Sequence, residues 1–444
     1  MHKSDIIVIG SGPGGMEVAS RALKQGLFVT GIEGGFGVRV RDVARRGGTC
    51  LNRGCIPTKA LCRSAEIMRL VDGTSEFGVS VGSVCLDYAK AAERKDAVVA
   101  ALRDNVALML SNAEIVTGEA RFTASDTVEV NGEVYTAPRI VIATGSRPAS
   151  LDIPGAALAI DSDRLLAMEK LPSSIAIIGG GVIGMEFACI LSAFGVDVTV
   201  IEYCKEILPN FDRDIAKRLR TSLSREGMQI ITGAQVTEIT LEKRVEYIVK
   251  GKPASVEVDE VLMAVGRRPV IPEGAEQIGI SLSRGAIVVD DTFATSVSGV
   301  YAIGDVNARM MLAHVASAQG ATVMGADVNL GVMPAVAFTS PECAMVGLAE
   351  EQCKEAGLNY KVTKSLFRAN GKAQAMGETD GLLKLIVDAD TRLILGCHVC
   401  GAHAADLVQE AALAMSSALP VDAIASTIHA HPSLSEILHS ATCL

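Results

Sequence analysis

The sequence predicts an α/β fold with two doubly wound parallel sheets, because one pattern of strand, glycines and acid occurs twice. The runs IIVIGSGPGG (6–15) and IAIIGGGVIG (175–184) each end a hydrophobic strand in G-x-G-x-x-G. Glu33 and Glu202 each end the next predicted strand, at the same distance after the first glycine. The glycines of the two patterns are Gly10, Gly12 and Gly15, and Gly179, Gly181 and Gly184. A single fingerprint of this kind is weak, but two with the same layout are a strong signal.

The physical requirements of this pattern indicate a dinucleotide in each unit. Glycines let the backbone approach a pyrophosphate at the N-terminus of a helix, and Val182 of the second pattern is a further candidate for cofactor contact. The acid accepts hydrogen bonds from the diol of an adenosine ribose. The chain is therefore expected to bind two dinucleotides.

Later segments also occur in pairs. The runs EIVTGEA (114–120) and QIITGAQ (229–235) resemble each other, as do IVIATGSRP (140–148) and VLMAVGRRP (261–269). We predict that each set ends strands of the two sheets, which makes their small residues candidates for cofactor contact. These candidates are Ala120, Thr144, Gly145 and Gly266. The first unit carries an insertion at 41–112, helical from Pro57, and a linker is expected at 147–173.

The last third of the chain changes in character. VYAIGDV (300–306) predicts a strand that ends at Asp305, with a helix starting near Leu312. From 333 the sequence alternates like antiparallel strands, and helices are expected at 402–418 and 420–428. We therefore expect a first domain of 1–148 with 268–332, a second of 149–267, and an α+β domain of 333–444.

Composition excludes several classes of protein. The 444 residues are 49% hydrophobic with a net charge of −10 and no Trp, which argues against nucleic-acid binding. The apolar stretch 175–201 fits strand, turn and helix better than a membrane span. The absence of an export signal and the odd number of cysteines, 11, predict a reducing cytoplasm in which most thiols stay free.

A second strong signal lies in the insertion, where GGTCLNRGCIPTK covers 47–59. Cys50 and Cys55 flank a glycine where a helix starts, and a helix N-terminus favours a reactive thiolate. Small residues such as Gly48 and Thr49 would let the pair lie against a flat partner. The alternative is two ordinary buried cysteines; the two nucleotide patterns favour a redox pair.

The C-terminal signal is HAHPSLSE at 429–436. Glu436 lies where it can orient the ring of His431, and a histidine held by a carboxylate is a general base near neutral pH. The alternative is a capping or surface histidine. His429 is expected to be structural.

Together these motifs resemble the flavoprotein disulfide reductase family, and within it the dihydrolipoamide dehydrogenases, over essentially the whole chain. The family pattern G-G-T-C-x-N-x-G-C-x-P lies on 47–57 without a gap, and its H-P motif with a following acid lies on His431 to Glu436. The resemblance implies two Rossmann-like domains with a C-terminal dimerisation domain. It also implies FAD in the first glycine site, NAD in the second, and a redox disulfide between Cys50 and Cys55.

The resemblance assigns roles to individual residues. Cys55 would face the flavin, and Cys50 would exchange with substrate. Lys59, paired with Glu186, would lie near flavin N5. Two further contacts to the flavin are implied: Asp305 at the ribityl–pyrophosphate region, and the helix start Met311, Leu312, Ala313 and His314 at the pyrimidine edge. His431, with Glu436 as its partner, would be supplied by the other subunit of a homodimer.

The implied activity is oxidation of dihydrolipoamide with reduction of NAD. Glu202 favours NAD over NADP because a carboxylate repels a 2′-phosphate, and only Lys205 follows as a cation. The expected partner is the lipoyl domain of a 2-oxoacid dehydrogenase complex or a glycine-cleavage carrier protein. Two alternatives are an NAD(P)H-dependent reductase of another disulfide or of a metal ion, and a flavin-binding protein without turnover.

Several features depart from these motifs or stand outside them. Cys397, Cys400 and His403 have metal-like spacing, but residues three apart in a strand point to opposite faces, so we expect a packed interior and no metal site. Residues 313–320 read AHVASAQG where relatives often have A-H-K-A-x-x-E-G. A basic run before and between the cysteines is expected to be solvated or to face an acidic lipoyl domain: Arg39, Arg41, Arg45, Arg46 and Arg53. The remaining cysteines are expected to be core or surface thiols: Cys62, Cys85, Cys189, Cys204, Cys343, Cys353 and the lone Cys443.

Overall fold

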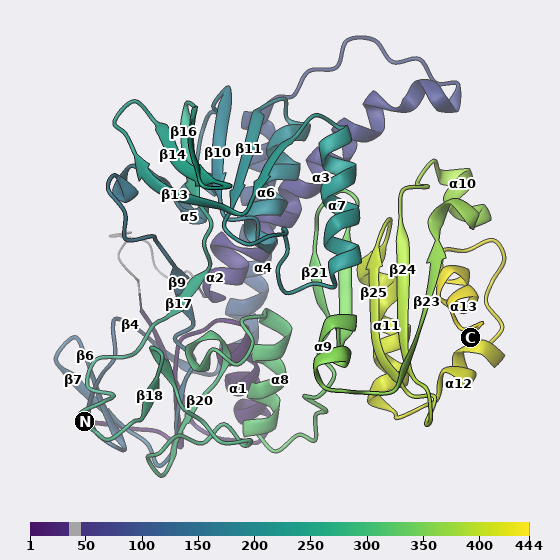
Figure 1. Cartoon of the computed structure of the whole chain (residues 1–444). Coiled ribbons are helices and arrows are strands. Elements are labelled where there is room, and N and C mark those ends of the chain that lie inside the picture. Colours follow the sequence, from purple (N-terminus) through teal and green to yellow (C-terminus); the bar gives the residue numbers. More distant parts are fainter. Residues whose placement is uncertain (35–45, 444) are drawn as a thin grey trace. The chain divides into compact units, whose positions relative to one another are not determined.

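The structure, a computed structural model, describes residues 1–34 and 46–443. Contacts between residues divide the chain into two compact units. Unit 1 comprises Met1–Leu61, Ala89–Ala149 and Arg267–Leu330, and unit 2 comprises Cys62–Tyr88, Ser150–Gly266 and Gly331–Leu444 (Figure 1). Arg39, Arg41 and Arg45 of the basic run lie outside the described residues.

A five-stranded parallel sheet forms the centre of unit 1, in the order β20-β8-β2-β3-β4. Its strands are β2 (Ile6–Ile9), β3 (Val29–Glu33), β4 (Glu114–Thr117), β8 (Ile140–Ile142) and β20 (Val300–Ala302). Every residue of β2 and β8 is buried, as expected for strands covered on both faces. Helix α1 (Pro13–Lys24) follows β2 and packs against α8 (Ala313–Val323). The sequence therefore predicted this sheet correctly.

Smaller elements complete unit 1. A second sheet has the order β1-β7-β6-β5, and two short antiparallel ribbons pair β9 with β17 and β18 with β19. Their bounds are β1 (His2–Lys3), β5 (Arg121–Ala124), β6 (Thr127–Val130), β7 (Glu133–Thr136), β9 (Ser146–Pro148), β17 (Arg267–Pro269), β18 (Leu282–Ser283), β19 (Ala286–Ile287) and the 3-10 turn η3 (Gly304–Asn307).

The predicted insertion is helical. It contains α2 (Gly48–Arg53), α3 (Cys55–Asp72), the 3-10 turn η1 (Thr74–Phe77) and α4 (Tyr88–Met109). The long helix begins at Cys55, two residues before the expected Pro57, and Gly54 separates it from the short helix α2. Both cysteines of the motif thus lie in helices.

Unit 2 contains a second parallel sheet, in the order β12-β11-β10-β16. Strand β10 (Ser174–Ile178), helix α6 (Val182–Ala193) and strand β11 (Asp197–Glu202) repeat the arrangement of β2, α1 and β3. The other elements of this part are η2 (Ala156–Leu158), α5 (Ser162–Leu166), α7 (Arg213–Arg225), β12 (Gln229–Thr232), β13 (Ala234–Ile239), β14 (Arg244–Val249), β15 (Lys252–Glu257) and β16 (Glu260–Met263). The apolar stretch 175–201 is therefore strand, turn and helix, as predicted.

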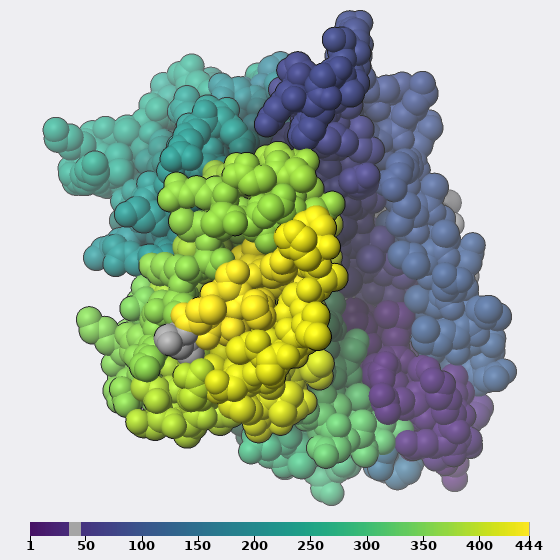
Figure 2. Space-filling view, turned by 90° about the vertical axis from the view of Figure 1, so that its right-hand side faces the viewer, coloured from purple at the N-terminus to yellow at the C-terminus, as the bar shows by residue number. Residues whose placement is uncertain are grey.

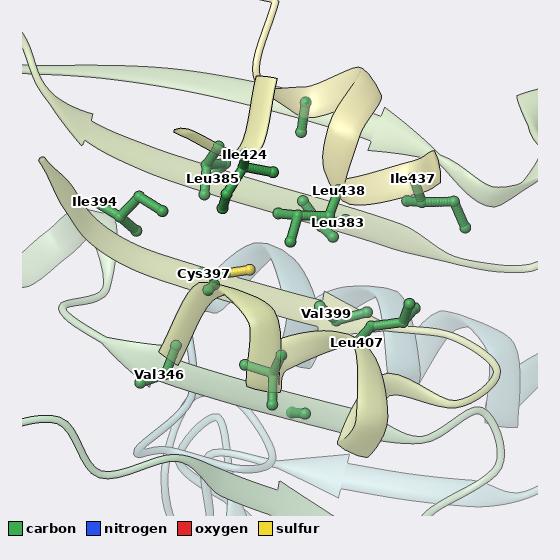
Figure 3. Close-up of a cluster of buried hydrophobic side chains, with 14 of the residues drawn as sticks. Val346, Leu383, Leu385, Ile394, Cys397, Val399, Leu407, Ile424, Ile437 and Leu438 are labelled. Atoms are coloured by element: carbon green, nitrogen blue, oxygen red, sulfur yellow. The ribbon is translucent and has the colours of Figure 1, made fainter. Parts of the chain in front are cut away.

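The C-terminal part of unit 2 is an antiparallel sheet in the order β21-β22-β25-β24-β23. Its elements are β21 (Ala335–Ala337), β22 (Cys343–Gly347), α9 (Glu350–Glu355), β23 (Tyr360–Leu366), η4 (Phe367–Ala369), α10 (Gly371–Met376), β24 (Leu382–Asp388), β25 (Ile394–Cys400), α11 (Ala404–Ser416), α12 (Val421–Ser426) and α13 (Glu436–Ala441). The yellow C-terminal helices lie against the yellow-green residues of the same part (Figure 2). One face of the sheet packs on these helices in a core that includes Cys397, Leu407 and Leu438 (Figure 3).

No helix within residues 1–34 and 46–443 is long and apolar enough to cross a membrane.

Candidate redox site and dinucleotide-binding loops

The first glycine loop is shaped for close approach of a ligand to its backbone. Gly10 has φ +105°, and a Cβ there would lie 2.3 Å from the carbonyl oxygen of Ala143. A Cβ on Gly15 would lie 1.9 Å from the carbonyl oxygen of Gly10. No atom lies within 4 Å of the Cβ position of Gly12, at the start of α1. The loop therefore has no space for side chains at Gly10 and Gly15 but an open face at Gly12. This arrangement fits a diphosphate at a helix N-terminus.

The second loop repeats these features closely. Gly179 has φ +108° and a virtual Cβ 2.4 Å from the carbonyl oxygen of Ala264, and the space at Gly181 is open. A Cβ on Gly184 would lie 2.0 Å from the carbonyl oxygen of Gly179. Val182 is the first residue of α6. Each unit therefore holds one loop that fits a dinucleotide.

Each predicted acid lies against its glycine loop through an equivalent hydrogen bond. The N–H of Ser11 donates to Glu33 Oε2 at 2.8 Å, and the N–H of Gly180 donates to Glu202 Oε2 at 2.5 Å. Glu202 Oε1 also accepts from the N–H of Cys204 at 2.6 Å. These bonds fix both carboxylates beside the loops, where a ribose diol would bind.

The surroundings of Glu33 contain charge as well. Burial raises the pKa of Glu33, while the hydrogen bonds from Ser11 and the guanidinium groups of Arg53 and Arg46 oppose that rise. The two arginines of the basic run that the structure describes therefore act electrostatically on this acid.

The predicted cysteine pair comes together at the start of two helices. Cys50 lies in α2 and Cys55 begins α3, and their thiols share a hydrogen bond. That hydrogen bond, together with burial, raises the pKa of Cys50, whereas the ammonium group of Lys59 lowers it. Both residues are partly exposed, which leaves them reachable from outside.

Close backbone contact places the cysteine helix at the first glycine loop. Gly48 begins α2, and a Cβ there would lie 2.6 Å from the Cα of Gly12. The N–H of Gly47 donates to Ser11 Oγ at 3.1 Å. Thr49 lies between Gly48 and Cys50 in α2. The loop that fits a diphosphate and the thiol pair thus belong to one site in unit 1.

Asp305 is held by residues that sequence reasoning missed. It lies in η3, and its Oδ2 accepts from the hydroxyl of Ser146 at 2.5 Å. Arg267 Nε donates to Ser146 Oγ at 2.7 Å, and Gln319 Oε1 accepts from the N–H of Gly304 at 2.7 Å. The sequence did contain signals for these residues. Ser146 and Arg267 lie in the paired runs GSRP and GRRP, and Gln319 stands where relatives often have Glu.

The other predicted cofactor residues of unit 1 lie in tight turns and at a helix start. Thr144 Oγ1 donates to the carbonyl oxygen of Val270 at 2.6 Å, and Gly145 has φ +71°. Ala120 is buried just before β5. Met311, Leu312, Ala313 and His314 include the first residues of α8, with Leu312 at its N-cap. Gly266, which has φ +106°, ends the second repeat in unit 2.

The histidine motif forms its predicted pair in unit 2. His431 Nδ1 lies 2.9 Å from Glu436 Oε1, and the N–H of Ser433 donates to Glu436 Oε2 at 2.8 Å. The Ser433 bond and then the imidazole lower the pKa of Glu436. The His431 side chain is 79% exposed, whereas that of His429 is 6% exposed and its Nε2 lies 3.1 Å from Glu410 Oε1. His429 therefore packs inside, as expected for a structural residue.

Two predicted associations stay predictions, one between residues of different units and one between two subunits. They are the Lys59–Glu186 pair and the approach of His431 to the thiols. Within unit 2, Glu186 is buried on α6 and its Oε1 accepts from the N–H of Phe338 at 2.9 Å. No group of three or more histidine, cysteine or acidic side chains among the described residues is arranged to hold a metal ion.

Comparisons with known proteins agree with this geometry. Residues 4–320 match the pyridine nucleotide-disulphide oxidoreductase family, and residues 333–442 match the dimerisation domain of that family. The chain is 40% identical to a dihydrolipoyl dehydrogenase of Thermus scotoductus over 99% of this chain and 97% of the relative, and 38% identical to one of Bacillus subtilis over 98% and 97%. A solved structure, the HOCl-induced flavoprotein disulfide reductase RclA from Escherichia coli, superposes with a TM-score of 0.87 at 30% identity, covering 99% of each chain. The chain therefore belongs to the pyridine nucleotide-disulphide oxidoreductase family, as its repeated glycine loops and cysteine pair predicted.

Proposed function

We propose that this chain is a dihydrolipoyl dehydrogenase, which oxidises a dihydrolipoyl group to lipoyl and reduces NAD. The observation that carries the proposal is the Cys50–Cys55 thiol pair, held in hydrogen-bond contact at the loop that begins α1. The curated relatives that share 38–40% of its sequence over nearly their whole length carry that name.

FAD would be held by the first glycine loop, Glu33 and Asp305, and the nicotinamide dinucleotide by the second loop and Glu202. When bound, FAD supplies an acceptor that takes an electron pair from a dithiol and gives a hydride to a nicotinamide. The open Cβ positions at Gly12 and Gly181 support these sites, because both loops leave room for a diphosphate. Lys59, Gly48, Thr49 and the start of α8 would complete the first site.

The protein's own groups carry the thiol chemistry. In the oxidised enzyme Cys50 and Cys55 form a disulfide, and His431 takes a proton from a substrate thiol. The substrate thiolate attacks Cys50 and releases Cys55, and the second substrate thiol then displaces Cys50 to leave lipoyl product and a reduced pair. The raised pKa of Cys50 in the reduced pair supports its role as the exchanging thiol, because its proton is retained once the disulfide has been reduced.

Glu436 acts through His431 as a positioning residue. Its carboxylate accepts from Ser433 and meets His431 Nδ1, so Nε2 points away and is the atom that would take the proton. The lowered pKa of Glu436 supports this, because the carboxylate stays charged and holds the ring through Nδ1.

We also propose a homodimer in which His431 of one subunit serves the thiols of the other. The match of 333–442 to a dimerisation domain supports association of two chains. The expected domains are then 1–148 with 268–332, 149–267 and 333–444. The substrate would be carried on the lipoyl domain of a 2-oxoacid dehydrogenase complex or a glycine-cleavage carrier protein, in the cytoplasm.

Mixing inactive subunits tests the shared site. Cys50→Ser and His431→Ala homodimers should each be inactive with dihydrolipoamide and NAD. After subunits are exchanged, one site in each mixed dimer has both groups, so activity should return to about a quarter of the wild-type value on statistical mixing. No recovery, with exchange verified by mass spectrometry, would reject the shared site.

A second candidate is an NAD(P)H-dependent reductase of another disulfide or of a metal ion. The structural likeness to a flavoprotein disulfide reductase at 30% identity favours it. Steady-state assays with dihydrolipoamide, oxidised glutathione and Hg(II), each with NAD and NADP forms, separate the two. A kcat/KM for dihydrolipoamide and NAD below that of a competing pair would reverse the assignment.

A further inference from the structure

A second pair of cysteines faces each other across the C-terminal sheet. Cys343 is the first residue of β22, Cys400 is the last residue of β25, and the two are directly opposite in the antiparallel ladder. The N–H of Gly401 donates to the carbonyl oxygen of Glu342 at 2.8 Å, so the hydrogen bond flanks the pair rather than joining it. Opposite residues in such a non-hydrogen-bonded pair have Cα atoms about 4.5 Å apart. A disulfide needs about 4.4–6.8 Å.

The side chains of this pair are already in contact. The thiols of Cys343 and Cys400 share a hydrogen bond, and both residues are 0% exposed. Alternation along β25 places Cys400 on the face of the sheet opposite to Cys397, which points into the helical core (Figure 3). Cys189 of α6 is near enough to act electrostatically on Cys343.

We propose that Cys343 and Cys400 are a second redox-active dithiol, which a hydroperoxide converts to a cross-strand disulfide. One thiol attacks the O–O bond of hydrogen peroxide and becomes a sulfenic acid, with release of water. The other thiol displaces a second water from that sulfur and forms the S–S bond. Two thiols are oxidised and one peroxide is reduced, so atoms and electrons balance.

The position of the pair makes the reaction conditional. Burial raises the pKa of Cys343, so its thiol stays protonated near neutral pH and reacts slowly. The pair closes the end of the ladder, where strands open locally more easily than in the middle of a sheet. A brief opening that breaks the Gly401–Glu342 hydrogen bond would admit a small neutral oxidant.

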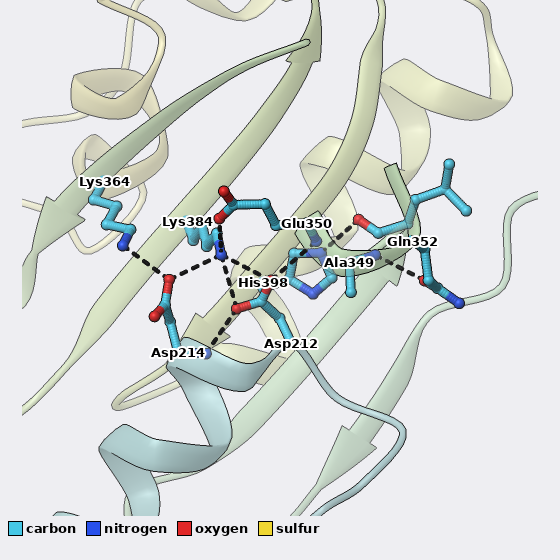
Figure 4. A network of polar contacts seen from close by, with 9 residues as sticks. Asp212, Asp214, Ala349, Glu350, Gln352, Lys364, Lys384 and His398 are labelled. Atoms are coloured by element: carbon cyan, nitrogen blue, oxygen red, sulfur yellow. Dashed lines mark hydrogen bonds and ion pairs between the residues drawn. The ribbon is translucent and has the colours of Figure 1, made fainter. Parts of the chain in front are cut away.

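Ion pairs of Lys384 hold the neighbouring part of the sheet face that carries Cys400. Lys384 and His398 are opposite each other, and His398 shares its face with Cys400 two residues away. Lys384 Nζ donates to Asp212, Asp214 and Glu350 at 2.9, 2.8 and 2.6 Å, and its side chain is 1% exposed (Figure 4). This network resists wider opening of the face, which leaves the end of the ladder at Gly401 as the route of access.

Peptide mapping of the purified flavoenzyme tests the proposal. The protein is first reduced and freed of reductant under anaerobic conditions, then treated with hydrogen peroxide, denatured in N-ethylmaleimide, digested without reductant and analysed by mass spectrometry. We expect a linked peptide that joins Cys343 to Cys400, formed at least about tenfold more slowly than the Cys50–Cys55 link, since reactivity follows the thiolate fraction. Cys397→Val should still form the link, and Cys400→Val should lose it.

The result that would overturn the proposal is measured on the wild-type protein, so it does not depend on whether a variant folds. It is alkylation of both Cys343 and Cys400 in protein that has been held in peroxide for about a thousand half-times of the Cys50–Cys55 reaction. A Cys343–Cys189 link in place of the expected one would also overturn it.

Discussion

The chain contains two pairs of thiols that each share a hydrogen bond, yet they sit in different surroundings. Cys50 and Cys55 lie at the starts of two helices, partly exposed, with the charge of Lys59 acting on Cys50. Cys343 and Cys400 lie across a sheet, fully buried. Contact between two sulfurs therefore does not by itself make a catalytic pair of cysteines. Access for substrate and a helix N-terminus beside a nucleotide loop distinguish the first pair.

The largest expected effect comes from removing the first pair. Cys55→Ser should lower kcat with dihydrolipoamide and NAD by at least about 10³-fold, because no second sulfur remains to complete the exchange. Cys400→Val, with the same number of thiols removed, should leave kcat within about twofold. Equal losses in both variants, measured at saturating substrate, would abolish the distinction between the pairs.

A charge removal should expose the second pair selectively. Lys384→Met leaves the fully buried Asp212 without its cation, which should reduce the free energy of unfolding by about 3–5 kcal/mol. The rate at which N-ethylmaleimide labels Cys343 should rise, while labelling of Cys50 stays unchanged. The matched control is Lys364→Met, because Lys364 is 46% exposed and its pair should contribute under about 1 kcal/mol. Unchanged labelling of Cys343 would show that the network does not protect this face.

The same network should make stability depend on acid. Burial acts to raise the pKa of Asp214, but its ion pairs with Lys364 and Lys384 prevail and hold it at about 2, below the usual 3.8. The stability that this group contributes is present above pH 4 and is lost as the pH falls toward 2. Denaturant unfolding across that interval should show a shallower loss for Asp214→Asn than for the wild type. If the free energy of unfolding fell equally steeply with pH in Asp214→Asn and the wild type, the ion pairs of Asp214 would not contribute to stability.

The smallest expected effect concerns Arg53, which stands between the first two cysteines. Burial raises the pKa of Glu33, and the charge of Arg53 opposes that rise. Arg53→Val should therefore weaken FAD binding by a few-fold only, measured by reconstitution of the apoprotein, and should leave labelling of Cys343 unchanged. A change of more than tenfold would mean that Arg53 holds the site together rather than tuning it.

Local features of the sequence predicted most of the fold and of the site. The glycine loops, Glu33, Glu202 and the Cys50–Cys55 pair follow from spacing within short segments, because a strand, a turn and a helix fix their geometry. Cys397 was correctly expected in a packed interior. The family resemblance supplied the roles of residues such as Asp305, which no local pattern would assign.

Contacts between distant segments could not be predicted. Cys343 and Cys400 lie opposite each other because of the register of β22 against β25, and no local sequence pattern encodes that register. The Lys384 network joins β24 to the start of α7 and to α9, and the Ser146–Arg267 contact requires the pairing of β9 with β17. In each case the partner is set by tertiary packing, although the paired runs GSRP and GRRP drew attention to the last two residues.

Anaerobic titration with a reductant tests the central claim most directly, namely that Cys50 and Cys55 exchange electrons with bound flavin. The purified yellow enzyme should take up two electron pairs per chain, one for the flavin and one for the disulfide, whereas Cys55→Ser should take up one. Uptake of a single pair by the wild type, or of two by Cys55→Ser, would contradict it.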